Sequence, residues 1–118
     1  MYLNNKHFKN VLRLQNIKPE DFDKFERLSS KAVLFSTGSR VLIVYVNTIV
    51  FIRNNNIIQL NTDGWKTMTT KKWINYGLSC FTGSNVVNLC QEKYVWYIVQ
   101  NDDEPEEYRD NMKIQLED

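Results

Sequence analysis

The sequence contains few of the residues that interrupt regular structure, with four glycines and two prolines among 118 residues. Hydrophobic residues make up 42% of the chain and aromatic residues 13%. This composition excludes collagen-like and intrinsically disordered chains. We therefore expect one folded domain spanning residues 1–118, with a core large enough to be stable without disulfides or metals.

Long hydrophobic runs are also missing. The longest, Val41–Val46, is far shorter than the roughly 18–20 residues that a membrane-spanning helix needs. The first ten residues lack the basic patch and following apolar stretch of a secretory signal. The sequence therefore predicts an intracellular, cytoplasmic protein with no membrane partner.

Cysteine and histidine are scarce, which limits the chemistry available. Cys80, Cys90 and His7 do not form a metal-ligand spacing, and a reducing cytoplasm favours buried free thiols over a disulfide. The chain has no metalloprotease, nucleophile-elbow or phosphate-loop motif. Asp63 before Gly64 is typical of a turn rather than of catalysis. We expect no enzyme activity, catalytic residue, metal or cofactor.

Charge is distributed unevenly along the chain. Residues 1–99 contain 13 Lys or Arg and 6 Asp or Glu, whereas residues 100–118 contain 2 and 8. A basic body is a clue to nucleic-acid or acidic-surface binding. An acidic end folded back onto that body would cancel much of the field, so both interpretations stay open.

Residues 1–30 read as a helical element. A first amphipathic helix ends near Asn16, and its apolar positions, one helical turn apart, are Phe8, Val11 and Leu12. A second short helix is predicted from Pro19 to Ser30, with apolar positions at Phe22, Phe25 and Leu28. This helical hairpin could bind a partner, but apolar helix stripes usually pack on the core.

Residues 31–100 carry the pattern of a β core. Six strand-like runs are separated by short polar turns: Ala32–Phe35, Arg40–Val46, Thr48–Arg53, Ile57–Leu60, Asn85–Cys90 and Tyr94–Gln100. The predicted fold is α+β, with the helical hairpin packed on a small antiparallel sheet of about six short strands and one helix inserted near residues 70–80. Val41–Val46 is apolar on both faces. If the chain does not cover its second face, a homodimer is expected.

The remainder, residues 101–118, is predicted to be an acidic loop followed by an edge strand. Asn101–Asp110 is too charged for a core, and Pro105 interrupts it. Its acidic part, residues 102–107, could imitate nucleic-acid phosphates or could simply be solvated. Met112–Leu116 has the pattern of a last strand.

Residues 63–78 combine a turn, a strand pattern and a helix start. Asp63-Gly64 predicts the turn, and alternation over residues 65–70 predicts a short strand. Thr70 is expected to cap a helix that begins at Lys71. The buried stripe of that helix is expected at Trp73, Ile74, Gly77 and Leu78. Lys71 and Lys72 would lie in its first turn, where positive charge is unfavourable, which is a mild indication of function.

This segment holds the candidate binding residues. Cations beside aromatic rings are typical of a surface that follows phosphates and stacks bases. Tryptophans at such positions are, however, more often part of a core. The candidate binding surface consists of Trp65, Lys66, Thr67, Lys71, Lys72, Trp73 and Tyr76.

The same segment carries a resemblance. Asn47-Thr48 precedes an apolar strand, Leu60–Asn75 reads LNxxGWxTxTTKxxIN, and Val95–Tyr97 is aromatic. This pattern resembles a group of small uncharacterised bacteriophage proteins, over residues 31–100. The resemblance implies a phage origin and a shared fold, and it implies no activity.

Two functional hypotheses follow. The first is a non-catalytic phage accessory protein that binds a host protein or complex in the infected bacterium, for example to inhibit a defence or regulatory complex. It follows from the phage resemblance, the small size and the missing catalytic motifs. The alternative is a nucleic-acid-binding protein that uses the basic and aromatic surface at residues 65–76.

Overall fold

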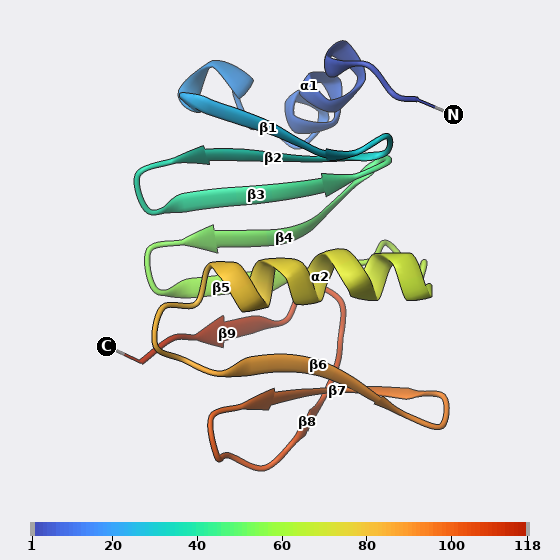
Figure 1. The fold of residues 1–118 in the computed structure, drawn as a ribbon, viewed down its shortest axis with the longest axis vertical. Helices are drawn as coiled ribbons and strands as arrows, with labels where there is room; N and C mark the ends of the chain where they lie inside the picture. The colour runs from blue at the N-terminus through green and yellow to red at the C-terminus, as the bar shows by residue number, and fades with distance from the viewer. Residues whose placement is uncertain (1, 118) are drawn as a thin grey trace.

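A computed structural model of the chain describes residues 2–117. Two sheets, both antiparallel, and two helices form the fold (Figure 1). The six-stranded sheet has the order β1-β2-β3-β4-β5-β9, and the three-stranded sheet has the order β6-β7-β8. In chain order the elements are α1 (Asn5–Leu14), a 3₁₀ turn (Pro19–Asp21), β1 (Lys24–Ser29), β2 (Ala32–Thr37), β3 (Arg40–Tyr45), β4 (Thr48–Asn54), β5 (Ile57–Leu60), α2 (Met68–Cys80), β6 (Val87–Glu92), β7 (Val95–Gln100), β8 (Glu106–Glu107) and β9 (Lys113–Gln115).

The predicted α+β class and antiparallel pairing are confirmed. Strands β2 to β5 occupy the predicted runs, and β6 pairs with β7 as the predicted second hairpin. The prediction of a single sheet is wrong, because β6 and β7 pair with β8 in a separate sheet, and β1 and β9 complete the six-stranded one. The β4–β5 turn is tight because Asn55 adopts a positive φ of 57°, and Asn101, directly after β7, adopts a positive φ of 51°. Asparagine tolerates this conformation better than most residues.

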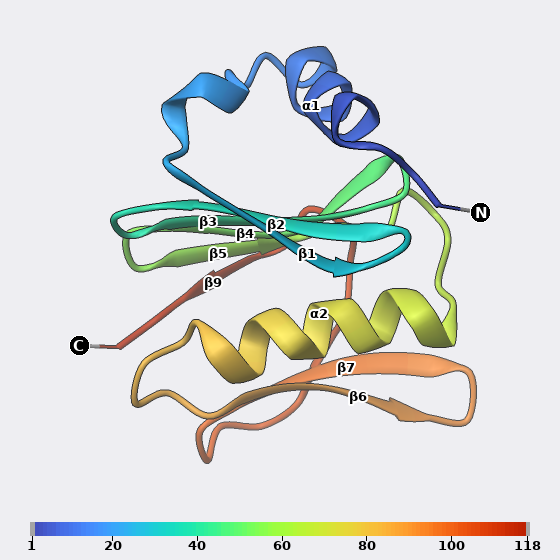
Figure 2. The ribbon, with the colours of Figure 1, turned by 45° about the horizontal axis from the view of Figure 1, so that its top comes forward.

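Two apolar clusters cover opposite faces of the six-stranded sheet. Figure 2 shows helix α1 over one face and helix α2 over the other. Helix α1 packs on one face through Phe8, Val11 and Leu12. Helix α2 and the β6–β7 hairpin form the second cluster with the other face. Strand β3 is therefore covered on both sides by its own chain, so the exposed face that would have favoured a dimer is not present.

The predicted second helix is wrong. Only Pro19–Asp21 is helical, as a single 3₁₀ turn, and Lys24–Ser29 forms β1 at the edge of the sheet. Three apolar residues at three-residue spacing are compatible with a short helix. Pairing with β2 prevails because strand preference depends on the neighbouring strand more than on the local sequence.

Part of the acidic segment is integral to the fold, contrary to the expectation that it is too charged for the core. Tyr108 is buried in the α2-side cluster, and Trp96 lies against it at a ring-centroid distance of 5.6 Å. The predicted last strand is confirmed, since β9 pairs with β5 and buries Ile114. The acidic side chains lie outside the core, whereas four apolar or aromatic residues of the same segment lie within it: Tyr108, Met112, Ile114 and Leu116.

The β3–β4 turn contains a strained residue. Val46 has a φ of +54°, a conformation that a β-branched side chain rarely adopts. Its N–H donates to the Lys31 carbonyl at 2.9 Å, and its own carbonyl accepts from His7 Nε2 at 2.8 Å. These two contacts hold the turn in place despite the strain.

Replacing Val46 with Asn is therefore expected to stabilise the protein by about 1 kcal/mol, because Asn adopts positive φ at a lower cost. Urea unfolding of the two proteins measures the difference. Val44→Asn is the matched control on the preceding strand, where the side chain is fully buried, and it is expected to destabilise strongly. A loss of stability in Val46→Asn would contradict the assignment of strain to this residue.

Candidate functional site

Helix α2 begins three residues earlier than the sequence pattern predicts. Thr67 is its N-cap, because the Thr67 Oγ1 accepts a hydrogen bond from the Thr70 N–H at 3.1 Å. The predicted strand over residues 65–70 and the predicted cap at Thr70 are both wrong. Threonine is a favourable N-cap at position 67 and at position 70, so the residue type alone does not locate the start of the helix. Thr70 lies in the first turn of α2 and is buried. Lys71 and Lys72 consequently lie beyond the first three helical residues, where the helix dipole acts on them more weakly.

The seven predicted binding residues do not form one surface. Trp65, with 70% of its surface exposed, stands out from the loop before α2, whereas Trp73 is buried in the core. Tyr76 is half-buried with its ring edge-to-face on Trp73, at 5.8 Å between centroids. The predicted stripe of α2 is confirmed, and it shows that Trp73 is a packing residue. Those that remain at the surface are Trp65, Lys66, Thr67 and Lys72, with Lys71 half-exposed.

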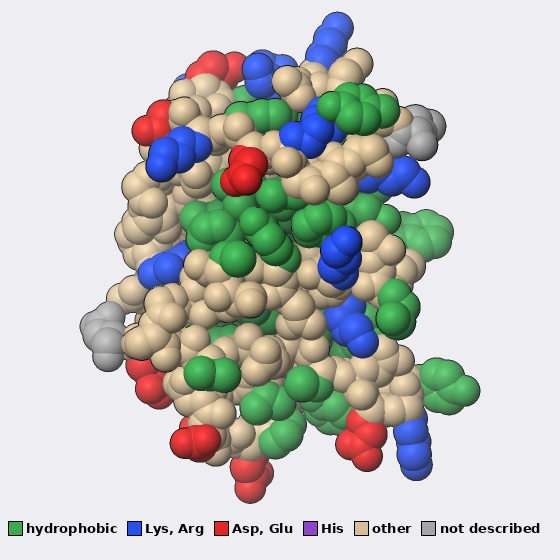
Figure 3. Space-filling model, viewed as in Figure 1, with side chains coloured by type: hydrophobic (Ala, Val, Ile, Leu, Met, Phe, Trp, Pro, Cys, Tyr) green, Lys and Arg blue, Asp and Glu red, His purple; other side chains and the backbone are tan. Residues whose placement is uncertain are grey.

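The three lysines each lie against a neighbouring group. Lys71 Nζ donates to Gln91 Oε1 at 3.2 Å. Lys72 Nζ lies 4.8 Å from the centre of the Trp73 ring, and Lys66 Nζ lies 5.6 Å from that of Tyr108. In Figure 3, basic side chains alternate with apolar ones over the start of α2. Cation–π contacts of this kind orient the ammonium groups without removing their charge.

The loop that carries Trp65 is held by one carboxylate. Asp110 accepts hydrogen bonds from the Thr62 N–H at 2.9 Å, from the Thr62 hydroxyl at 2.9 Å and from the Gly64 N–H at 3.1 Å. The Tyr108 hydroxyl donates to the same carboxylate at 2.5 Å. We call these residues, Thr62, Gly64, Tyr108 and Asp110, the Asp110 clamp. It fixes the backbone immediately before Trp65.

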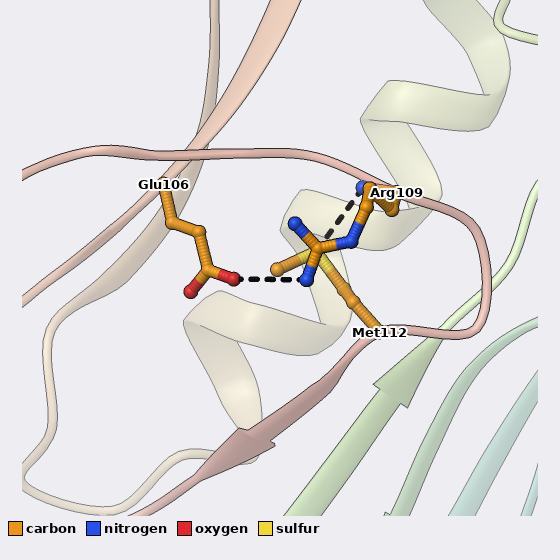
Figure 4. A network of polar contacts seen from close by, with 3 residues as sticks. All are labelled: Glu106, Arg109 and Met112. Atoms are coloured by element: carbon orange, nitrogen blue, oxygen red, sulfur yellow. Dashed lines mark hydrogen bonds and ion pairs between the residues drawn. The ribbon is translucent and has the colours of Figure 1, made fainter.

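The segment behind the clamp is itself held in place (Figure 4). Arg109 Nη2 pairs with Glu106 Oε2 at 3.2 Å, and the Arg109 N–H donates to Met112 Sδ at 3.4 Å. The Asn111 N–H donates to the carbonyl of Leu60, at the end of β5, at 2.7 Å. The Trp65 loop is thus tied to the sheet through a segment more than forty residues away in sequence.

The clamp shifts the titration of both its acidic groups. Burial acts to raise the pKa of Asp110, but the hydrogen bonds from Tyr108, Thr62 and Gly64 outweigh it and hold that pKa below its ordinary value. Burial and the bond to Asp110 raise the pKa of the Tyr108 hydroxyl well above its ordinary value. Around neutral pH the clamp therefore consists of a carboxylate and a neutral phenol.

A pocket of about 340 Å³ lies beside Trp65. The β3–β4 turn forms one wall and the 62–67 loop forms the other, so residues far apart in sequence meet there. Asp63 is the only charged side chain in the lining. The lining residues are Tyr45, Val46, Asn47, Thr48, Val50, Thr62, Asp63, Trp65, Thr67 and Thr70. Apart from Asp63 and the Asn47 amide, the lining consists of aliphatic groups, aromatic rings and hydroxyls, and such a pocket can receive an apolar side chain.

A second cavity of about 300 Å³ shares Asn47, Thr48 and Asp63 with this pocket. It extends towards the end of α1 and is richer in side-chain amides, which come from Gln15, Asn47, Gln59, Asn61 and Asn111. The turn at Asn47 and the loop after Leu60 thus lie together between the two cavities. These two segments carry the two halves of the phage-like pattern. The sequence showed both segments but not that they meet.

Residues 2–117 contain no group of three His, Cys, Asp or Glu side chains placed to hold a metal ion. Across the same residues, no helix is long and apolar enough to cross a membrane. Cys80 and Cys90 are free but exposed, so the expectation of buried thiols is wrong. Cys80 lies in the last turn of α2 on its outer side, and Cys90 lies on the outer face of β6, opposite the buried Leu89.

The comparisons with known proteins give one match. No curated protein and no solved structure is detectably similar to this chain. Residues 22–115, from just before β1 to the end of β9, match the family described as Kyanoviridae Gp96 protein. This match confirms the resemblance to phage proteins, although it does not test the motif at Leu60–Asn75. The chain belongs to the Kyanoviridae Gp96 protein family, a family of phage proteins.

Proposed function

We propose that this protein is a non-catalytic phage accessory protein that binds a host protein in the cytoplasm of the infected cell, such as a component of a defence or regulatory complex. The contact surface is the Trp65 ring together with Met68 and the adjoining pocket. The observation that carries the proposal is a tryptophan that is 70% exposed on a loop held by the Asp110 clamp.

An exposed tryptophan on a held loop has the properties of a binding hot spot. Tryptophan is enriched at such positions because it contributes a large apolar area. The Asp110 clamp already orders the backbone of the loop that carries Trp65. Binding of a partner at Trp65 therefore costs less conformational entropy than binding to a flexible loop would. Met68, 77% exposed one residue into α2, extends the apolar area with an adaptable side chain.

Charge around this surface indicates the chemistry of the partner. Lys66 and Lys72 are exposed beside the apolar centre, and Lys71 is half-exposed. A complementary surface would place an apolar side chain in the pocket and acidic groups against the lysines, which also speeds encounter. We therefore propose a host protein surface with an apolar centre and an acidic rim.

Replacing Trp65 with Ala is expected to weaken partner binding by about 2 kcal/mol, which is roughly thirtyfold in Kd. Tagged wild-type protein is first used to isolate the host partner, with nuclease present. The purified partner is then titrated with each variant by isothermal calorimetry. Trp65→Phe keeps a ring and is expected to lose less affinity than Trp65→Ala.

Val86→Ala is the matched control, because Val86 is an exposed apolar residue at the opposite end of α2. It is expected to bind the partner like the wild type. Equal binding by Trp65→Ala, Val86→Ala and the wild type would rule out the proposed surface. A partner captured only through nucleic acid would disappear in the nuclease-treated sample.

Nucleic-acid binding is the second candidate, and the exposed pair of Trp65 and Lys66 favours it as a stacking ring beside a cation. That function predicts an affinity that falls steeply with salt. Lys66→Glu would then weaken the binding of labelled single-stranded DNA or RNA. Protein binding through the apolar pocket predicts a shallower salt dependence and no shift of the labelled strand.

A further inference from the structure

Strand β1 is the outer strand of the six-stranded sheet, and its free edge has no pairing strand among the described residues. Figure 2 shows β1 at the near edge, with α1 on one face of the sheet and α2 on the other. Edge strands present unpaired backbone N–H and C=O groups, and proteins commonly protect such edges with charged side chains. Residues 23–27 contain two acidic and two basic side chains, Asp23, Lys24, Glu26 and Arg27.

The two faces of β1 carry different side chains. Phe25 and Arg27 pair with Phe35 and Val33 of β2, which belong to the α1-side cluster. Glu26 pairs with Leu34, in the α2-side cluster, so Lys24 and Glu26 point to the α2 face. Phe25 is 37% exposed although its ring lies 5.0 Å from that of Phe35. One more strand beside β1 would cover it.

Geometry restricts how β1 could pair with the β1 of a second copy. Two identical antiparallel strands are related by a two-fold axis, and side chains directly opposite each other must lie on the same face of the sheet. Because successive residues alternate between faces, the axis must pass beside one residue, which then faces its own copy. Only a few such registers exist over Asp23–Ser29.

Charge selects one of these registers. An axis at Lys24, Glu26 or Arg27 would place that residue against an identical charge. An axis at Phe25 places Lys24 opposite Glu26 of the other copy, and Asp23 opposite Arg27. By symmetry each of these pairs occurs twice, so every charge from residue 23 to residue 27 meets its opposite, while Phe25 meets Phe25. Opposite charges and aromatic pairs across neighbouring strands are favourable, and like charges are unfavourable.

The side chains concerned are available for these pairs. The side chains of Lys24 and Glu26 are exposed and form no hydrogen bond or ion pair with another described side chain. Arg27 donates to the Ser29 carbonyl at 3.2 Å and to Asn5 Oδ1 at 2.9 Å. Its guanidinium carbon also lies 4.4 Å from the centre of the Tyr2 ring and 5.4 Å from that of Phe8, contacts that leave N–H groups at its edge free, since a guanidinium has five N–H donors in all. Its remaining N–H groups can meet Asp23 of a second copy.

We infer that the protein self-associates through antiparallel pairing of β1 with β1 of a second copy, with Phe25 on the two-fold axis. The pairing joins two six-stranded sheets into one continuous sheet. The alternating charges on this edge thus disfavour other registers, and they also disfavour strands of other proteins that do not carry the complementary charges. This inference is independent of the surface around Trp65, which lies at the start of α2.

Charge exchange tests the register. The full-length protein is studied by sedimentation equilibrium over a range of concentrations, and we expect a reversible monomer–dimer equilibrium. Lys24→Glu creates two Glu–Glu contacts, and Glu26→Lys creates two Lys–Lys contacts, so each is expected to weaken the dimer by about tenfold. The double variant Lys24→Glu with Glu26→Lys restores both pairs and is expected to dimerise like the wild type. Thermal melting of each variant checks that it is folded.

Cross-linking tests the axis directly. In a Cys80→Ser and Cys90→Ser background, Phe25→Cys places two thiols opposite each other, and mild oxidation is expected to give a covalent dimer. Ser29→Cys is the matched control on the same strand, because this register separates the two copies of residue 29 by roughly 27 Å. A strictly monomeric protein, dimers that tolerate both single charge reversals, or equal cross-linking at residues 25 and 29 would each overturn the inference. A monomer would leave the edge open to a strand of a different protein.

Discussion

Replacing Asp110 with alanine is expected to lower the free energy of unfolding by about 3 kcal/mol. The substitution removes the acceptor for the N–H groups of Thr62 and Gly64 and for two hydroxyls. The Tyr108 hydroxyl belongs to a buried residue and would lose its partner, which is costly. Urea unfolding measures the change, and hydrogen exchange of the Thr62 and Gly64 amides is expected to accelerate.

Asp102→Ala is the matched control, since it removes an exposed carboxylate from the same acidic segment. It is expected to change stability by less than about 0.5 kcal/mol. Tyr108→Phe removes only one of the four donors to Asp110 and should cost less than Asp110→Ala. If Asp110→Ala and Asp102→Ala had the same stability, the Asp110 clamp could not be what holds the Trp65 loop.

The clamp also predicts a specific response to acid. Because the folded-state pKa of Asp110 lies below its ordinary value, its stabilising effect is present above about pH 4 and is lost as pH falls through the folded-state pKa. Asp110→Asn lacks this titration. The stability difference between wild type and Asp110→Asn, measured by urea unfolding from pH 7 to pH 2, is therefore expected to shrink towards low pH. A difference that stayed constant with pH would contradict the assignment.

Replacing Gly77 with alanine is expected to destabilise the protein by about 2 kcal/mol, although alanine is the better helix former. A Cβ at position 77 would lie 2.5 Å from a ring carbon of Phe51 on β4. Phe51 is completely buried, so its ring cannot move aside without disturbing the core. The helix-propensity gain of about 1 kcal/mol is smaller than the cost of overpacking.

The steric origin of this effect can be separated from helix propensity. Ser79→Ala, on the exposed side of α2, is the matched control and is expected to be neutral or slightly stabilising. Phe51→Leu removes part of the opposing ring. In the double variant Gly77→Ala with Phe51→Leu, the loss of unfolding free energy measured in urea should therefore be smaller than the sum of the losses in the two single variants. Strict additivity would show that the ring is not the obstacle.

The candidate site was only partly accessible from the sequence. Trp65 and Lys66, which the sequence pattern assigned to a short strand and a candidate binding surface, are exposed on the loop before α2. Trp73 was assigned to the candidate binding surface because tryptophan is a typical stacking residue. It lies in the buried stripe of α2, however, and is therefore a packing residue. Tyr45 and Asp110 were missed, since neither has a local signal. Tyr45 lies in an apolar strand, and Asp110 lies in an acidic run of similar residues.

The sequence by itself determined the strands β2 to β5, the β6–β7 hairpin and the inward face of α2, because alternation and helical periodicity are local properties. Tertiary structure alone decided that residues 24–29 form an edge strand, that both faces of β3 are covered by the chain, and that Asp110 fixes a loop 46 to 48 residues earlier. These outcomes depend on which segments pack together. Such long-range contacts override weak local preferences and leave no periodic trace in the residues that make them.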